Sequence, residues 1–323
     1  MVPSEIEKKQ ILISPLNWGM GHVSRIIPLI QLFLKNKNTV FVACNAEQKR
    51  ILIQYFPHLK FIDHEGYPFK FGRNGNFALD LAKQFLPLRK RLKQEVEEVD
   101  YLVGLYKIDL VISDHRYGFR SNIAHSILLC HQLNLPTHRF EGFIQKMHYH
   151  YLSLFNEIWV PDTVNSDFAG DLSINKKEFD VEYIGSLSRF SLYDEVHEKT
   201  IDKVVIISGP AVYAKQFLED QLLSNKEMNI VIIAPQEILV NVNSSNFIFK
   251  SSEDWIACDK IILHSKRIVS RCGYSTLMDL IQLKIPFSIT PTPGQREQEY
   301  LFDLWYKKSL SDTVSSIQNN EHS

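Results

Sequence analysis

Short apolar runs alternate along the chain with longer stretches in which apolar residues recur at the spacing of a helix face. The runs that predict strands fall at 11–15, 39–44, 59–62, 110–113, 127–130, 157–161, 204–210, 229–235, 247–249, 267–271 and 286–290. Short buried strands separated by amphipathic helices are typical of βαβ units on a parallel sheet. The pattern therefore predicts an α/β fold of two Rossmann-like, doubly wound parallel-sheet domains.

The segments between the strands predict the main helices. Apolar positions in 23–34 lie on one helix face, and Pro28 is expected to kink this helix or move its start. A long helix is expected at about 78–106, interrupted near Pro87, after a glycine-rich loop at 66–77. Further helices are expected at 252–265, 275–283 and 297–308.

The regular alternation is lost from 163 to 200, where Asn, Asp, Ser and Lys are common and one short strand is expected at 181–185. This break predicts the domain organisation. The expected parts are an N-terminal domain at 1–165, a connection at 166–200, a C-terminal domain at 201–310 and a polar tail at 311–323. The two domains are expected to face each other across a cleft.

Composition narrows the class of protein. The 323 residues include 36 Lys plus Arg against 37 Asp plus Glu, a net charge of -1 that gives no bulk reason to expect nucleic acid. The four cysteines form no Cys-x-x-Cys pair, so neither a zinc site nor a disulfide framework is predicted. The polar start and the lack of an 18-residue apolar run favour a soluble, cytoplasmic protein.

Ligands of open parallel sheets bind where loops follow the carboxyl ends of the strands, so a binding site is expected at the strand-to-helix junctions. The first junction contains Gly19, Met20, Gly21 and His22. Its two glycines allow a tight turn beside a ligand, and His22 is a candidate general base, although a structural turn with a capping histidine is the alternative. The third glycine of a dinucleotide fingerprint is missing, which argues against an NAD-dependent enzyme.

A second junction predicts a phosphate site. Gly273 precedes a helix whose first turn carries Ser275 and Thr276, and backbone N–H groups with hydroxyls at a helix start bind phosphate. Asp279 lies further along this helix, where its carboxylate can accept two ribose hydroxyls. Ser208 and Gly209, at the turn that opens the second half, are a plausible wall of the same pocket, and an ordinary capped helix is the alternative.

Two other groups of polar residues follow strands. After the last strand, a loop stiffened by prolines presents Gln295, Gln298 and Glu299, which suit sugar hydroxyls or simply begin a polar helix. In the first half, Asp114, Arg116 and His131 follow two strands and are expected near His22. Asp114 could orient an imidazole or accept a proton, and Arg116 and His131 could bind an acceptor; polar loop residues are the alternative.

Taken together, these motifs resemble the nucleotide-sugar glycosyltransferases of the GT-B fold. The likeness is greatest to the lipid-linked N-acetylglucosaminyltransferase of peptidoglycan synthesis, of glycosyltransferase family 28. The positions that carry it are Gly19-Met20-Gly21-His22, Ser270-Arg271-Cys272-Gly273, Asp279 and Gln298-Glu299-Tyr300, in the family's order and spacing over nearly the whole chain. Asp279 stands where the family has Glu, Glu299 replaces the second Gln, and the first loop is shorter by a glycine.

The resemblance implies a role for each matching residue. Gly209, Gly273, Ser275 and Thr276 would hold the diphosphate, Asp279 would hold the ribose, and Gln298 and Glu299 would contact the donor sugar. The expected donor site also includes Ser208, Arg271 and Gln295. His22 would face the acceptor and the reacting carbon, with Asp114 and His131 as further catalytic candidates. Gly19, Gly21 and Arg116 would line the acceptor side.

The expected reaction is an inverting, metal-independent transfer of a hexose, N-acetylglucosamine or a relative, from a UDP-linked donor to a hydroxyl of a glycan or lipid-linked acceptor. The absence of an Asp-x-Asp pair, and of a Glu-x7-Glu pair in the corresponding region, favours this mechanism. No cofactor is expected besides the nucleotide sugar. The alternatives are a nucleotide-sugar hydrolase, in which His22 activates water, and a non-catalytic nucleotide-sugar-binding protein.

One basic segment suggests a contact with membranes. Arg89, Lys90, Arg91 and Lys93 lie beside Phe85, Leu86, Leu88 and Leu92 in the expected long helix. This pattern suits weak binding to an anionic membrane at its cytoplasmic face, and a solvated helix face is the alternative.

Overall fold

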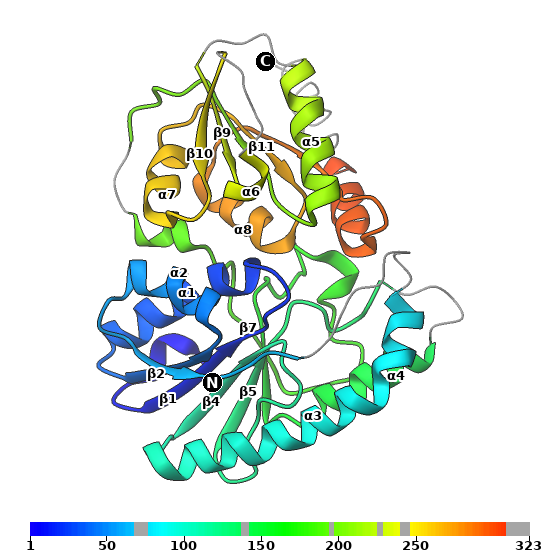
Figure 1. The fold of residues 1–323 in the computed structure, drawn as a ribbon. Helices are drawn as coiled ribbons and strands as arrows, with labels where there is room; N and C mark the ends of the chain where they lie inside the picture. The colour runs from blue at the N-terminus through cyan, green and yellow to red at the C-terminus, as the bar shows by residue number, and fades with distance from the viewer. Residues whose placement is uncertain (68–76, 137–141, 194–196, 225–228, 240–245, 308–323) are drawn as a thin grey trace, which may run out of the picture. The chain divides into compact units, whose positions relative to one another are not determined.

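The computed structural model describes residues 1–67, 77–136, 142–193, 197–224, 229–239 and 246–307, with backbone alone for 77–86. The chain divides into two compact units (Figure 1). The first unit comprises Met1–Val196 together with Asp254–Ile256, and the second comprises His197–Glu253 and Ala257–Ser323.

The first unit is built on one parallel sheet. Its seven strands lie in the order β3-β2-β1-β4-β5-β6-β7, and every neighbouring pair is parallel. The strands are β1 (Gln10–Pro15), β2 (Thr39–Cys44), β3 (Lys60–Asp63), β4 (Leu110–Asp114), β5 (His125–Leu129), β6 (Glu157–Val160) and β7 (Val181–Tyr183). The helical segments are η1 (Pro3–Glu5), α1 (Gly21–Lys35), α2 (Ala46–Tyr55), α3 (Phe77–Tyr106), α4 (Gly142–Leu152), η2 (Gly170–Leu172) and η3 (Arg189–Leu192).

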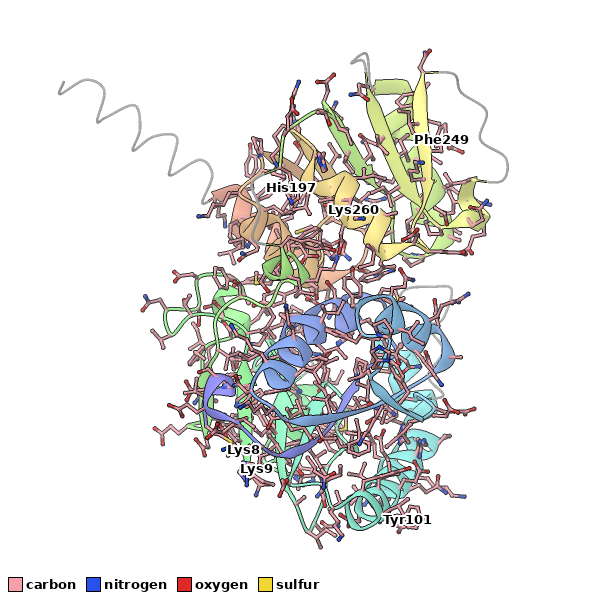
Figure 2. The ribbon with its side chains drawn as sticks, turned by 90° about the vertical axis from the view of Figure 1, so that its left-hand side faces the viewer. Lys8, Lys9, Tyr101, His197, Phe249 and Lys260 are labelled. Atoms are coloured by element: carbon pink, nitrogen blue, oxygen red, sulfur yellow. The ribbon has the colours of Figure 1, made fainter. Side chains whose placement is uncertain are left out.

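Helices cover both faces of this sheet, which explains why its central strands carry apolar residues on both faces. Successive residues of β1 point to opposite faces: Ile11 and Ile13 pack in the cluster that contains the buried face of α1, whereas Leu12 packs with Val99 and Val103 of α3. On the outer face of α3, Tyr101 points away from the sheet (Figure 2) and is 68% exposed. The amphipathic pattern of α3 therefore fixes which of its sides meets the sheet.

The second unit repeats the same design with fewer strands. Its five parallel strands lie in the order β10-β9-β8-β11-β12. They are β8 (Lys203–Ile206), β9 (Ile230–Ala234), β10 (Phe247–Ser251), β11 (Ile268–Arg271) and β12 (Phe287–Thr290). The helices are α5 (Ala211–Ser224), α6 (Gln236–Leu239), α7 (Trp255–Leu263), α8 (Tyr274–Leu283) and a further one at 296–307. Figure 2 labels Phe249 on β10 and Lys260 on α7.

Both sheets reverse their strand order once, and this decides where a ligand can bind. The reversal falls between β1 and β4 in the first sheet and between β8 and β11 in the second. The loops that leave adjacent strands at such a point run to opposite faces of the sheet, which opens a crevice at the carboxyl ends of the strands. Each unit therefore contains one favoured ligand site.

The fold class and the parallel strands are confirmed, and two details differ from the expectations. Pro28 lies inside α1, which begins at Gly21, so it does not move the start of this helix, and α3 continues through Pro87 without interruption. Residues 166–196 of the expected connection at 166–200 belong to the first unit, and β7 within them pairs with β6 as an ordinary strand of its sheet. Most of the expected 66–77 loop and the whole 311–323 tail lie outside the described residues.

Two further observations concern cysteines and membranes. All four cysteines are buried, and none of them forms a disulfide bond. Within the described ranges, no helix combines the length and the apolar character that crossing a bilayer requires.

Candidate functional site

The reversal point of the first sheet brings His22 and Asp114 together. His22 is the second residue of α1, which follows β1, and Asp114 is the last residue of β4. Pro15 of β1 is in register with Asp114, so the two segments leave neighbouring strands at the same edge. Nδ1 of His22 lies 3.0 Å from Oδ2 of Asp114.

The two partners differ in exposure. The side chain of Asp114 is fully buried, whereas that of His22 is 15% exposed. With Nδ1 directed at the carboxylate, Nε2 is the ring nitrogen left for a substrate hydroxyl. A buried carboxylate behind a partly exposed imidazole is the arrangement in which the acid orients the base.

A third member of the cluster is Arg25, which the analysis of strand ends had missed. Arg25 lies one helical turn after His22, is 2% exposed and forms an ion pair with Oδ1 of Asp114. Its Nη2 lies 2.6 Å from Nδ1 of His22, and its Nη1 lies 3.0 Å from Nδ1 of His131. The i, i+3 spacing from His22 places both residues on one helix face and is the signal that could have predicted this contact.

Two more groups complete the cluster behind His22. His115 has a φ of 58°, in the left-handed region that residues with a β-carbon rarely occupy. Its Nε2 lies 2.7 Å from Sγ of Cys130, and its ring stacks on His131 with the centroids 5.4 Å apart. Strained backbone of this kind is enriched at functional sites. In the described part of the chain, no three of the candidate ligand side chains are placed to share a metal ion.

Burial and charge set the protonation of these groups. Burial lowers the pKa of His22, and the positive charge of Arg25 lowers this pKa further, against the opposing effect of Asp114. Burial alone would raise the pKa of Asp114, but Arg25 and His22 outweigh it, so this pKa is lowered. The pKa of His115 falls well below its usual value, through burial first and Arg25 second. At neutral pH the cluster therefore holds an ionised carboxylate beside a neutral imidazole, as general-base catalysis requires.

The predicted acceptor-binding role of Arg116 does not fit the structure. Its side chain is fully buried and forms an ion pair with Glu95 of α3, with Nε 2.9 Å from Oε1. Tyr67 donates to the other carboxylate oxygen of Glu95 at 2.6 Å, and Nη2 of Arg116 donates to the carbonyl of Glu65 at 2.8 Å. Arg116 therefore ties α3 to the sheet. His131 and Asp114, in contrast, do join His22, whereas Gly19 and Gly21 form its turn, with φ of 100° at Gly19.

The reversal point of the second sheet presents the start of α8. Gly273 is the N-cap, and no side chain caps this helix end, so its first-turn N–H groups can receive an anion. A β-carbon at Gly273 would lie 3.5 Å from the hydroxyl of Thr276. Ser275 and Asp279 lie in the same helix and are 9% and 7% exposed. These are the residues expected at the phosphate and ribose positions.

Two buried hydroxyls beside this helix start have no hydrogen-bond partner among the described residues. They are Oγ1 of Thr292, 1% exposed, and Oγ of Ser270, also 1% exposed. Gly209, with a φ of 94°, closes the turn after β8, and a β-carbon there would lie 3.9 Å from Oγ1 of Thr292. Unpaired buried hydroxyls are uncommon in native proteins, so these two are candidates to bind a water molecule or a ligand. The sequence predicted Gly209 as part of the phosphate pocket, whereas it gave no signal for Thr292.

Some residues expected to bind the donor instead hold the loops of this unit. Arg271 donates from Nη1 to the carbonyl of Pro291 at 2.8 Å and from Nη2 to that of Tyr213 at 3.0 Å, so it joins the start of α5 to the loop after β12. Gln298 accepts from the N–H of Thr292 at 2.8 Å, and Glu299 accepts from the N–H of Gly294 at 3.0 Å. These side chains shape the 291–295 loop.

Ser208 and Gln295 remain at the surface of this site. Ser208 is exposed in the turn before α5. Gln295 is exposed as well, and its Oε1 accepts from Nε2 of Gln298 at 2.5 Å. The loop after β12 therefore presents the amide pair of Gln295 and Gln298. Because Ser208 and Gln295 are both exposed, they remain candidates for contacts with the donor.

Comparison with known proteins identifies the fold. MnaA of S. aureus in complex with UDP has a TM-score of 0.56 and 12% identity, over 90% of this chain and 86% of that one. The glycosyltransferase SnogD from Streptomyces nogalater has a TM-score of 0.56 and 15% identity, over 92% and 85%. The spinosyn rhamnosyltransferase SpnG complexed with thymidine diphosphate has a TM-score of 0.53 and 14% identity, over 92% and 91%.

These similarities show the GT-B fold class, with its two Rossmann-like units. No family model matches the sequence, and no curated protein matches it either. At 11–15% identity, the matches establish the fold alone.

Proposed function

We propose that this protein is a glycosyltransferase that uses a nucleotide sugar. The observation that carries the proposal is the His22–Asp114 pair, with 3.0 Å between Nδ1 and Oδ2, at the reversal point of the first sheet. A partly exposed neutral imidazole backed by a buried carboxylate is suited to remove the proton of an acceptor hydroxyl.

The second unit supplies the donor side of the proposal. The uncapped start of α8, with Gly273, Ser275 and Thr276, is suited to a diphosphate, and Asp279 is suited to the ribose. The buried hydroxyl of Thr292 is unpaired beside Gly209 and gives a further donor to a phosphate oxygen. Two proteins of the same fold have been solved with UDP and with thymidine diphosphate, which supports a nucleoside diphosphate as the bound group.

The chemistry is an inverting displacement without a metal. Nε2 of His22 takes the proton of the acceptor hydroxyl, the resulting oxygen attacks the anomeric carbon, and the bond to the diphosphate breaks with its electron pair. Asp114 stabilises the imidazolium that forms. The N–H groups of α8 and the hydroxyl of Thr276 stabilise the charge that develops on the leaving diphosphate.

The narrower assignments rest on the motif resemblance. They are a UDP donor, N-acetylglucosamine or a related hexose as the sugar, and a glycan or lipid-linked acceptor, in a protein that needs no other cofactor. The loop shaped by Gln298 and Glu299 is the segment we propose to contact the sugar. The four cysteines are buried and none forms a disulfide, which fits a reducing compartment such as the cytoplasm.

The first test is a thermal-shift screen of the purified protein against UDP-, dTDP- and GDP-linked sugars. A ligand at 100 times its dissociation constant stabilises the folded state by about 2.7 kcal/mol, which gives a readable shift. Turnover of the stabilising donor is then measured with and without candidate acceptors. Product that forms only with an acceptor supports transfer, whereas rapid release of free sugar without one identifies a hydrolase in which His22 activates water. Binding without turnover under every condition identifies a binding protein.

A matched variant separates catalysis from binding in this screen. His22→Ala removes the proposed base, and His58→Ala removes an exposed histidine that follows α2 and lies outside the cluster. Both variants should keep the donor-induced thermal shift. Only His22→Ala should lose turnover.

A further inference from the structure

Arg25 contacts three members of the cluster at once. Its guanidinium forms an ion pair with Oδ1 of Asp114, and its two terminal nitrogens lie 2.6 Å from Nδ1 of His22 and 3.0 Å from Nδ1 of His131. The side chain is 3% exposed, so water does not screen these contacts. One buried cation therefore contacts Nδ1 of His22 and Nδ1 of His131.

The chemistry of the guanidinium fixes what those nitrogens can do. Arginine stays protonated and has only N–H donors, so a ring nitrogen that bonds to it must offer a lone pair. In a neutral imidazole, one nitrogen carries the hydrogen and the other carries the lone pair. Nδ1 of His131 therefore accepts from Arg25, which leaves the hydrogen of His131 on Nε2.

His22 is in a different position, because two partners compete for its Nδ1. Asp114, ionised at neutral pH, can only accept, so its 3.0 Å contact needs a hydrogen on Nδ1. The 2.6 Å contact with Arg25 needs a lone pair on the same nitrogen. Only the first arrangement leaves Nε2 with a lone pair to receive a proton, so the competition decides whether His22 can act as a base.

We propose that Arg25 is a positioning residue that sets the proton position on both histidines: it fixes His131 as an Nε2–H donor and competes with Asp114 for Nδ1 of His22. The consequence of this role of Arg25 for catalysis rests on the proposed function. Arg25 restrains the base in the free protein, and His131 presents a fixed hydrogen-bond donor beside it.

The charges around His22 give the direction of the effect. His22 is faced by Arg25 of its own helix, by Asp114 at the end of β4, by His115 after it and by His131 after β5. Removing the cation leaves the Asp114 carboxylate with His22 as its partner, so the hydrogen should move to Nδ1 and the pKa of His22 should rise. Loss of a like charge at this distance is expected to raise the pKa of His22 by about one unit or more.

The test is nitrogen NMR of histidine-labelled protein, because the chemical shifts of the two ring nitrogens report which one carries the hydrogen. In the unmodified protein, Nδ1 of His131 should be unprotonated and Nε2 protonated at neutral pH. A hydrogen on Nδ1 of His131 would overturn the proposal without any substitution, so the result does not depend on how a variant folds.

Three variants complete the experiment. Arg25→Met should shift His22 toward the Nδ1–H form and raise its pKa, whereas Arg25→Lys, which keeps a positive charge, should leave the pKa nearer to that of the unmodified protein. Arg50→Met, at an exposed position of α2, is the control and should change neither signal. An unchanged tautomer ratio and pKa of His22 in folded Arg25→Met contradicts the proposal.

Kinetics then separates this inference from the proposed function. If His22 is the base, the acid limb of the kcat/KM profile should move to higher pH in Arg25→Met, in step with the NMR titration. A protein that shows the NMR changes but transfers no sugar would refute the proposed function and leave the role of Arg25 standing. Transfer activity with no NMR change in Arg25→Met would support the proposed function and refute the role of Arg25.

Discussion

Asp114 lies at the end of β4 with no exposed surface, and one of its carboxylate oxygens is 3.0 Å from the ring of His22 while the other pairs with Arg25. The carboxylate is thus shared between a cation that cannot release its proton and an imidazole that can. This division keeps Asp114 ionised in a buried setting and leaves His22 neutral. It also makes the first unit the source of the base in the proposed reaction.

The donor site can be tested through Asp279. Replacing Asp279 with Ala should weaken the binding of donor and of free nucleoside diphosphate alike, because the carboxylate is the group proposed to hold the ribose hydroxyls. Loss of one charge-assisted hydrogen bond costs about 1.5–3 kcal/mol. Isothermal calorimetry with the free diphosphate measures the change, and Asp303→Ala, in the helix at 296–307, is the control. Equal affinities in Asp279→Ala and the unmodified protein would remove Asp279 from the site.

Metal independence is a second expectation. Because the start of α8 and its hydroxyls are proposed to stabilise the leaving diphosphate, turnover should persist in excess EDTA. The measurement is the initial rate with and without chelator, followed by addition of magnesium or manganese. Complete loss of the rate in EDTA, with recovery on adding metal, would contradict the mechanism.

Membrane contact is tested at a groove between α3 and α4. Arg89, Lys146 and His150 line it together with Phe143, Met147 and Tyr151, around a volume of about 330 Å³. Phe143 is 72% exposed, so basic and apolar groups share one surface. Arg91, by contrast, donates to Glu98 at 2.7 Å, which reduces its contribution. The predicted partner of this surface is an anionic lipid headgroup region.

The protein should therefore sediment weakly with anionic vesicles, less at high salt, and hardly at all with neutral ones. The double substitution Arg89→Gln and Lys146→Gln should abolish this binding, whereas Lys215→Gln in α5 should not. Indistinguishable sedimentation with the two kinds of vesicle would refute the contact.

The structural role of Arg116 gives a stability prediction. Arg116→Met leaves Glu95 as an unpaired, fully buried carboxylate, and breaking a buried ion pair in this way costs about 3–5 kcal/mol. Urea denaturation should show this loss, while the KM for an acceptor in the folded fraction stays unchanged. A large rise in that KM with little loss of stability would restore the acceptor-binding role expected from the sequence.

The sequence was informative about the strands because their apolar runs are continuous and regularly spaced. It was less informative about the prolines. Pro28 and Pro87 both lie inside helices, although a proline in a helix interior removes one backbone hydrogen bond. The position of the inter-unit boundary also differed, since β7 is a short strand whose identity depends on pairing with β6.

For the site, position in the strand pattern predicted His22, Asp114 and His131, since they follow or end β1, β4 and β5, three strands that are neighbours in the sheet. Arg25 escaped notice because it lies within a helix, away from any strand end. Arg116 lies two residues after Asp114 and was expected in the same site. Its side chain is instead directed by the ion pair with Glu95 of α3, a partner distant in sequence. A contact of that kind cannot be derived from local spacing.

The most direct test of the account compares His22→Ala with the unmodified protein in turnover of the donor identified by thermal shift, with donor affinity measured in parallel. Loss of a general base should lower kcat by about 100- to 10,000-fold and leave the affinity for the nucleotide unchanged. Asp114→Asn should also lower kcat, because it removes the charge that stabilises the imidazolium. Near-full kcat in His22→Ala together with complete loss in Asp114→Asn would contradict the account and identify Asp114 as the base.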